Sequence, residues 1–322
     1  TGLLGREVVA AFQRAGWKTV ATGLSRAKPP AIVRLDLLRK EDIERVLADV
    51  KPDVVVHCAA NRSPDSCAAD PAAATALNTT SAAHLAALTS SQPAFLLHIS
   101  TDYVFSGRRG EAPYGATAAP SPPNAYGRTK AAAEAAVLQA AAPGTAAVLR
   151  VPVLYGRTDE GGRGESAVGA LVDAVWRAQD GVRTGAGRVR VDHYAQRYPT
   201  CTEDVARVCV DVCDMYRSAL RGGDGRAGAR KESADELPRI LHFSAEDRMT
   251  KFEMCVVFAD ILGLPTDGLE AYVPSEEELR NDKVVRPYDC HLDTAVLREL
   301  GIGLQTVDFV AWWRRELRAF RR

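Results

Sequence analysis

Tyr126 and Lys130 are the side chains of this sequence best suited to moving a proton. They lie four residues apart at the start of an alanine-rich run over residues 131–142, so a helix places the phenol and the ammonium on one face. A nearby cation favours phenolate and lowers the pKa of a tyrosine from its usual value of about 10. Thr101 ends an apolar run and can offer its hydroxyl to the same carbonyl oxygen. We therefore expect these three residues to form a proton-transfer site, although any helix can carry Tyr and Lys at this spacing.

Gly2 and Gly5 are spaced like the last two glycines of a Gly-x-x-Gly-x-x-Gly loop, and a helical apolar pattern follows them. In such a loop the backbone approaches a pyrophosphate that lies at the N-terminus of the next helix. The buried strand and the first glycine of this motif are then expected upstream of Thr1. An ordinary helix start is the alternative for two glycines alone.

Arg26 and Lys28 stand where a dinucleotide site often has an acidic residue, about 20 residues after the glycine loop. An arginine can bind a 2′-phosphate through two parallel hydrogen bonds, and the lysine adds positive charge. The segment therefore predicts NADP(H) rather than NAD(H), with a solvated basic loop as the alternative. Asp36 and Leu37, after the next extended segment, suit the edge of an adenine.

Apolar strands alternate with helices through the first half of the chain. This rhythm predicts an α/β fold in which a doubly wound parallel sheet is covered by helices on both faces, over residues 1–156. The expected strands span residues 18–22, 32–36, 53–60, 95–99 and 146–152, and the expected helices include 41–50, 71–90 and the one that carries Tyr126. His57 and His98 lie inside two of these strands and are expected to be packed core histidines.

The second half, residues 157–322, has a different rhythm and predicts a smaller C-terminal α/β lobe with some segments that return to the sheet. The cleft between the two parts is where a substrate or partner would meet the cofactor. The expected strands are 189–192 and 239–244, and the expected helices are 165–178, one from Thr202 capped by its own hydroxyl, 250–262, 294–300 and 307–320. Residues 157–164 are expected to form a surface loop and residues 217–238 a mobile one.

Residues 192–200 combine a charge pair, two aromatic rings and an amide just before a helix. Such a polar patch with aromatic side chains suits a substrate wall, so His193, Gln196 and Arg197 are candidate substrate or partner residues. The alternative is a segment that joins the lobes and carries surface charges. Arg6, Glu7 and the paired arginines near the C-terminus are expected on solvated helix faces.

Composition excludes several classes of protein. The 322 residues are 46% hydrophobic and 25% charged with no formal net charge, which predicts a soluble globular protein with no bulk attraction to nucleic acid or membrane. No apolar run approaches the roughly 20 residues of a membrane helix. The seven cysteines include no Cys-x-x-Cys pair, so we expect no zinc or other metal site and no disulfide framework. The protein is then expected in a reducing compartment, the cytoplasm or the nucleus.

Several motifs, taken together in their order and spacing, resemble the extended short-chain dehydrogenase/reductases, in the branch that contains dTDP-4-dehydrorhamnose reductase. They are Thr-Gly-x-x-Gly at residues 1–5, His-Cys-Ala-Ala at 57–60, Ser-Thr-Asp-Tyr-Val-Phe at 100–105, Tyr-x-x-x-Lys at 126–130 and Arg-Val-Pro-Val-Leu-Tyr-Gly at 150–156. Within this branch the sequence is similar to the regulatory beta subunits of methionine adenosyltransferase. That likeness runs to about residue 303 and rests on residues 61–65, 165–168, 192–200, 204–206, 249–254 and 300–303.

The resemblance implies a role for each matching residue. Thr101 would polarise a substrate carbonyl, Tyr126 would donate the proton, and Lys130 would support the phenol and bind the nicotinamide ribose. The other cofactor residues implied are Gly2, Leu3 and Leu4 at the pyrophosphate, Ala59 and Ala60 along the cofactor, and Pro152, Val153 and Leu154 beside the nicotinamide.

The resemblance leaves three functions open. The first is an NADP-binding regulatory subunit that contacts the catalytic subunit of methionine adenosyltransferase. The second is an active NADPH-dependent reductase with a nucleotide-sugar substrate, and the third is a cofactor-binding protein with another partner. In the first case Trp312, Trp313 and Phe320 are candidates for the contact, while the alternative for the tryptophans is that they seal the second lobe's core.

Overall fold

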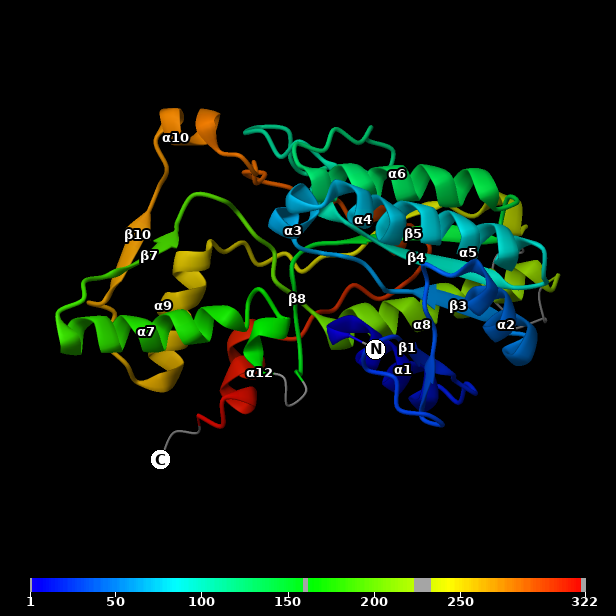
Figure 1. The fold of residues 1–322 in the computed structure, drawn as a ribbon, viewed down its shortest axis with the longest axis horizontal. Coiled ribbons are helices and arrows are strands. Elements are labelled where there is room, and N and C mark those ends of the chain that lie inside the picture. Colours follow the sequence, from blue (N-terminus) through cyan, green and yellow to red (C-terminus); the bar gives the residue numbers. More distant parts are fainter. Residues whose placement is uncertain (1, 159–161, 223–232, 320–322) are drawn as a thin grey trace.

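The computed structural model describes residues 2–158, 162–222 and 233–319, and Figure 1 shows an α/β layer beside a smaller lobe. The centre of the larger part is a four-stranded parallel sheet with the strand order β3-β4-β5-β9. Its strands are β3 (Val54–His57), β4 (Phe95–Thr101), β5 (Ala146–Val151) and β9 (Ile240–His242). All residues of β4 and β5 are buried, as expected for strands covered on both faces.

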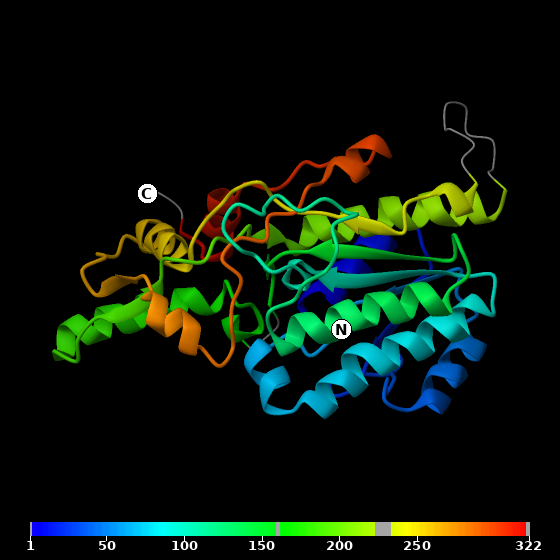
Figure 2. The same ribbon diagram turned by 90° about the horizontal axis from the view of Figure 1, so that it is seen from above.

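Helices cover both faces of this sheet, which confirms the predicted doubly wound α/β fold (Figure 2). On one face α1 (Leu3–Arg14) packs against α8 (Thr202–Leu220), and both contribute to the largest core with β4 and β5. On the other face the helices are α2 (Lys40–Val50), α5 (Ser81–Ser90) and α6 (Ala125–Ala140). A separate parallel pair, β1 (Ala21–Gly23) and β2 (Ile32–Arg34), precedes them.

The smaller lobe has its own core, in which Tyr155, Phe258, Trp312 and Trp313 pack together. Its elements are α7 (Ala170–Thr184), the parallel pair β7 (Val189–Asp192) and β10 (Leu269–Tyr272), α9 (Lys251–Leu262), α10 (Glu276–Asn281) and α12 (Phe309–Glu316). Three later elements, α8, β9 and α11 (Ala295–Glu299), pack in the larger part. The short parallel pair β6 (Leu154–Tyr155) and β8 (Thr200–Cys201) follows β5 and precedes α8.

Several boundaries differ from the sequence-based expectations. The expected helix over residues 71–90 contains a π-helical segment, Ala76–Thr80, between α4 (Pro71–Thr75) and α5, and a short α3 (Pro64–Ala69) precedes it. The helix expected from residue 165 begins only at Ala170, after a 3-10 turn over Arg163–Glu165. Helix α8 continues to Leu220, so the first part of the expected mobile loop is helical; residues 223–232 lie outside the described residues.

The prediction that Thr202 caps its own helix is wrong. Cys201 holds the N-cap position of α8, and the Thr202 hydroxyl is buried without a hydrogen-bond partner. It faces Gly156 so closely that a Cβ on this glycine would lie 1.9 Å from the hydroxyl oxygen. By contrast, α9 ends at Leu262 as predicted and begins one residue later than predicted, because Thr250 is its N-cap; Gly263 follows its end in the left-handed conformation.

Within the described ranges, no helix is both long and apolar enough to cross a membrane. The same residues contain no group of three or more His, Cys, Asp or Glu side chains that could hold a metal ion.

Candidate active site and cofactor site

Thr101 and Tyr126 are brought together by the end of β4 and the start of α6. Helix α6 begins one residue before Tyr126 because the Asn124 side chain caps it, accepting a hydrogen bond from the Gly127 N–H at 2.9 Å. The Thr101 side chain is buried and hydrogen-bonds Tyr126. The Thr101 hydroxyl also donates to Asp102 Oδ1 at 2.9 Å. The Thr101 hydroxyl and the Tyr126 phenol therefore lie side by side, as the sequence predicts.

The pKa of Tyr126 is raised rather than lowered, which corrects the sequence-based expectation. Burial is the largest cause, and the hydrogen bond with the Thr101 side chain acts in the opposite direction without cancelling it. The Asp102 charge raises the pKa of Tyr126 further. The phenol is therefore protonated at neutral pH, the form that a proton donor needs.

The Lys130 side chain binds the central sheet at β4. Its ammonium donates to the Ile99 carbonyl oxygen at 2.8 Å and lies 3.0 Å from His98 Nε2. Among the hydrogen bonds of the described residues, none joins Lys130 to Tyr126, so the third member of the expected site is not hydrogen-bonded to the phenol. Burial lowers the pKa of Lys130 to about 8, against the opposing charge of Glu134.

His57 and His98 are buried, as predicted for core histidines. Burial lowers the pKa of His57 to about 3, and the Lys130 charge acts in the same direction, so the ring is neutral. Burial also lowers the pKa of His98 well below its usual value. Sequence reasoning did not predict that His98 contacts the Lys130 ammonium.

Behind Lys130 lies a buried ion pair that sequence reasoning also missed. Glu134 follows Lys130 by one helical turn, and its carboxylate receives Arg150 Nε at 3.0 Å and a second guanidinium nitrogen at 2.6 Å. Both side chains are at most 4% exposed. Ser100 also donates to Glu134, and the Arg150 guanidinium lies 3.2 Å from His242 Nε2. A glutamate at helical spacing from Lys130 in an alanine-rich helix was the available signal.

The residues expected at a cofactor follow the carboxyl ends of parallel strands, which is where doubly wound folds bind ligands. Arg26 and Lys28 follow β1, Asp36 and Leu37 follow β2, Ala59 and Ala60 follow β3, and Pro152, Val153 and Leu154 follow β5. Asp36 accepts a hydrogen bond from the Leu38 N–H, and Leu37 packs partly against the α2–α5 core. Ala59 is exposed, whereas Pro152 is buried.

The N-terminus of α1 fits a phosphate group. Gly2 is its exposed N-cap, no side chain caps the helix, and its first turn carries no acidic residue. A Cβ built on Gly2 or Gly5 would meet nothing within 4 Å, so space is open beside this backbone. Leu3 and Leu4 begin the helix, and the Leu4 side chain is buried in the core, which leaves backbone N–H groups for a ligand.

Arg6 and Glu7 do not lie on a simple solvated face. Arg6 donates to Glu165 Oε2 at 2.8 Å, and Arg26 pairs with the other oxygen of the same carboxylate. Glu7 is 8% exposed, and its pKa is raised first by burial and then by the charge of Glu203. Glu165 thus connects the second lobe with α1 and with the loop after β1, two segments of the expected cofactor site.

The candidate substrate residues separate into two groups. Arg197 is buried, its guanidinium lies 5.7 Å from the Tyr103 ring centroid, and its charge lowers the pKa of the neighbouring Asp102 against the larger effect of burial. One of its nitrogens is buried without a partner, so it could bind an acceptor on a ligand. His193 instead lies 2.9 Å from the Thr250 hydroxyl, and the Gln196 amide donates to the Tyr194 carbonyl.

The family comparison agrees with this arrangement. A model described as the RmlD substrate binding domain matches residues 1–320. The chain belongs to this family. It is 37% identical over 311 residues to methionine adenosyltransferase 2 subunit beta of Danio rerio, an alignment that covers 96% of this chain and 85% of that protein.

Solved structures of the RmlD-like kind share the fold. A dTDP-4-dehydrorhamnose reductase of Clostridium acetobutylicum superposes with a TM-score of 0.71 at 21% identity, covering 99% of this chain and 96% of the other. The enzyme of the same name from Bacillus anthracis, solved in complex with NADP, gives 0.69 at 20% identity, with 98% and 94% covered. At this identity the comparison establishes the architecture.

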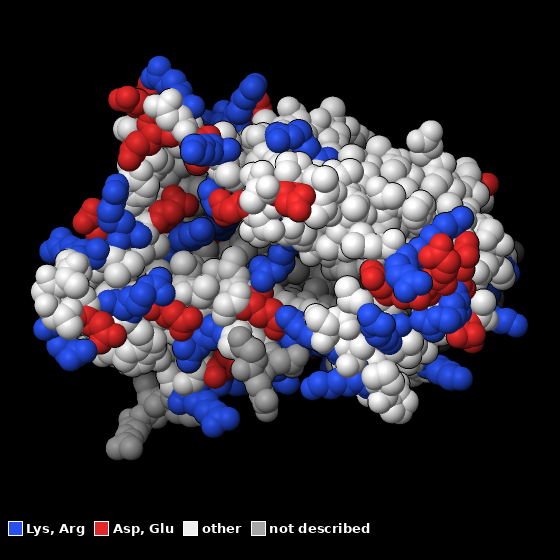
Figure 3. Space-filling model, in the orientation of Figure 1, with Lys and Arg blue, Asp and Glu red and all other residues white. Residues whose placement is uncertain are grey.

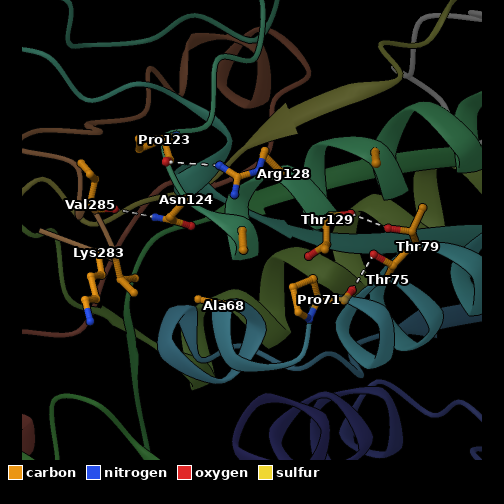
Figure 4. A pocket seen from close by; sticks show the side chains of 13 residues that line it. Ala68, Pro71, Thr75, Thr79, Pro123, Asn124, Arg128, Thr129, Lys283 and Val285 are labelled. Carbon is orange, nitrogen blue, oxygen red and sulfur yellow. Dashed lines mark hydrogen bonds between the residues drawn. The ribbon is translucent and has the colours of Figure 1, made fainter.

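Three further features of this RmlD-family chain lie outside the set of predicted site residues. The face drawn in Figure 3 is hollowed between the two parts, with basic and acidic side chains around the hollow. Lys251, whose pKa is lowered by burial and by the Arg197 charge, was missed by sequence reasoning. A separate cavity of about 370 Å³ is lined by Arg128 and Thr129 of α6 and by Lys283 (Figure 4), and none of the predicted site residues lines it.

Proposed function

We propose that this protein is an NADP(H)-binding regulatory beta subunit that assembles with a catalytic methionine adenosyltransferase and modulates S-adenosylmethionine synthesis. The observation that carries the proposal is the 37% identity to a methionine adenosyltransferase subunit beta across 96% of this chain. The seven cysteines are all free thiols, which supports a reducing compartment such as the cytoplasm or the nucleus.

The cofactor proposal rests on the open backbone at Gly2 and on the residues at the carboxyl ends of the strands. Gly2, Leu3 and Leu4 would bind the pyrophosphate through backbone N–H groups, and Arg26 with Lys28 would bind the 2′-phosphate. Asp36 and Leu37 would meet the adenine, Ala59 and Ala60 would line the cofactor, and Pro152, Val153 and Leu154 would border the nicotinamide. When bound, NADPH supplies a hydride.

We expect Arg26→Ala to weaken NADP binding about ten- to a hundredfold and NAD binding much less, because hydrogen bonds to charged groups are worth about 1.5–3 kcal/mol. Calorimetric titration of both cofactors measures this difference. Arg183→Ala, which changes a 74% exposed side chain at the end of α7, is the matched control and should leave both affinities unchanged. Equal affinities of the unchanged protein for NADP and NAD would contradict the preference.

The two tryptophans near the C-terminus do not form the partner contact considered from the sequence. Trp312 and Trp313 are 1% and 3% exposed and pack in the second lobe's core, so they cannot anchor a partner without unfolding it. Phe320 lies outside the described residues. A contact through this segment would depend on its exposed basic residues and on the chain beyond Arg318.

We expect the intact chain to sediment as a complex with a catalytic methionine adenosyltransferase subunit, and a chain that ends at Arg318 to bind more weakly. The shortened chain keeps Trp312 and Trp313, so the second lobe's core is retained. Absence of a complex with the intact chain, with and without NADP, would refute the partnership. Undiminished binding by the shortened chain would exclude only a role for the last four residues.

A second candidate function is an NADPH-dependent reductase that acts on a nucleotide-sugar ketone. The observation that favours it is the protonated Tyr126 phenol beside the Thr101 hydroxyl at the end of β4. In this function Thr101 polarises the carbonyl and Tyr126 gives its proton to the oxygen, while Arg197, with His193 and Gln196 further along the wall, positions the substrate.

A further inference from the structure

The Glu165 side chain from the turn before α7 is held by the larger part of the molecule. It is 12% exposed, and its two carboxylate oxygens bind Arg6, from the first turn of α1, and Arg26, from the loop after β1. Arg62, from the loop after β3, donates to the Glu165 carbonyl oxygen. The first turn of α1 and the loops after β1 and β3 therefore converge on one residue of the second lobe.

The Glu165 carboxylate is ionised in this position. Burial would raise its pKa, but hydrogen bonds from Arg6 and Arg26 and the charges of these two residues outweigh burial, and the pKa is lowered. A carboxylate held between two guanidinium groups resembles a phosphate in being an anion whose oxygens accept paired N–H hydrogen bonds. The arginines that hold it come from α1 and from the loop after β1, the two segments that we assign to the cofactor phosphates.

The backbone next to Glu165 is fixed on the other side. The Ser166 hydroxyl donates to the Leu154 carbonyl oxygen at 3.0 Å and accepts hydrogen bonds from the Val168 and Gly169 N–H groups. Ser166 is 1% exposed. These hydrogen bonds attach Ser166 to Leu154 of β6. Glu165 can therefore move away from the arginines through a change in the turn Arg163–Glu165 while Ser166 stays in place.

We propose that Glu165 is an internal anion that occupies Arg6 and Arg26 when no cofactor is present, and that the 2′-phosphate of NADP(H) displaces it. This inference rests on the proposed cofactor site. Two anions at hydrogen-bonding distance from one another repel, so the carboxylate and the phosphate compete for the same guanidinium groups. Cofactor binding would then release the turn Arg163–Glu165 from the cofactor loops and so report occupancy to the second lobe.

Glu165→Gln tests this competition because it keeps the size of the side chain and removes its charge. Calorimetric titration with 2′,5′-ADP and with 5′-AMP, which lacks the 2′-phosphate, is the measurement. We expect 2′,5′-ADP to bind about five- to twentyfold more tightly to the variant, with a smaller change for 5′-AMP, since a charge-assisted competitor is lost. Asp173→Asn removes the exposed partner of Arg163 in the same region and should change neither affinity.

Hydrogen exchange provides a second readout that does not depend on the variant. The Glu165 and Ser166 N–H groups bond to the Gly162 and Arg163 carbonyls, and NADP should accelerate their exchange in the unchanged protein. Unchanged or weaker 2′,5′-ADP binding by Glu165→Gln, or slower exchange with NADP, would overturn the inference and leave the cofactor proposal intact. Failure of the unchanged protein to bind either NADP or 2′,5′-ADP would overturn both.

Discussion

Replacing Tyr126 by phenylalanine is expected to lower NADPH-dependent reduction of a 4-keto sugar nucleotide by about a hundredfold to ten-thousandfold, the usual contribution of a positioned general acid. The phenol is protonated because burial raises its pKa, and the Thr101 side chain bonds it at the end of β4. Phenylalanine keeps the ring and removes the proton. NADP(H) binding should persist, because the proposed phosphate-binding residues lie elsewhere.

Steady-state turnover and calorimetric cofactor titration together measure this result. Tyr272→Phe, which changes a tyrosine on β10 in the second lobe, is the matched control and should retain turnover. Unchanged turnover in Tyr126→Phe would show that Tyr126 is not the acid. If neither the variant nor the unchanged protein reduces the ketone, the regulatory function is favoured.

Glu134→Gln is expected to lower the free energy of unfolding by about 3–5 kcal/mol, the cost of leaving one member of a buried ion pair without its partner. Arg150 is 2% exposed and its guanidinium bonds both carboxylate oxygens of Glu134. The amide of glutamine offers one acceptor and no charge, so the arginine stays buried and uncompensated. Urea denaturation followed by circular dichroism measures the difference.

Two variants make the ion-pair test specific. Glu270→Gln breaks an exposed pair with Arg190 and is expected to cost less than about 1 kcal/mol. Glu134→Leu combined with Arg150→Met should recover much of the stability lost by Glu134→Gln, because no buried charge is left unpaired. A loss below about 1 kcal/mol for Glu134→Gln would contradict the view that this pair is buried and tightly coupled.

Local signals predicted the parts of the fold whose causes are local. The continuous apolar runs at β3, β4 and β5 depend on neighbouring residues alone, as does the end of α9 at Leu262. Helix α8 starts at Thr202 as predicted, but its cap was mispredicted, because the Thr202 hydroxyl faces Gly156 on another segment. A pattern within residues 200–210 could not predict this contact, because Gly156 lies outside that range.

The candidate site shows the same division. Spacing correctly placed Tyr126 in the first turn of a helix and Thr101 at the end of a strand. It predicted a lowered pKa for the phenol, whereas burial raises it. The Lys130 ammonium is turned to His98 and Ile99, which belong to β4, so helical spacing alone could not place it.

The sequence alone was enough to predict the family, the alternation of strands and helices, and the loops that carry the proposed cofactor residues. These properties follow from hydrophobic periodicity and from short motifs that stay together in the chain. Three features could be read only from the folded structure. They are the protonated state of Tyr126, the burial of Trp312 and Trp313, and the ion pair between Arg26 and Glu165, which are 139 residues apart. Ionisation and pairing depend on burial and on contacts between distant segments, which exist only once the chain has folded.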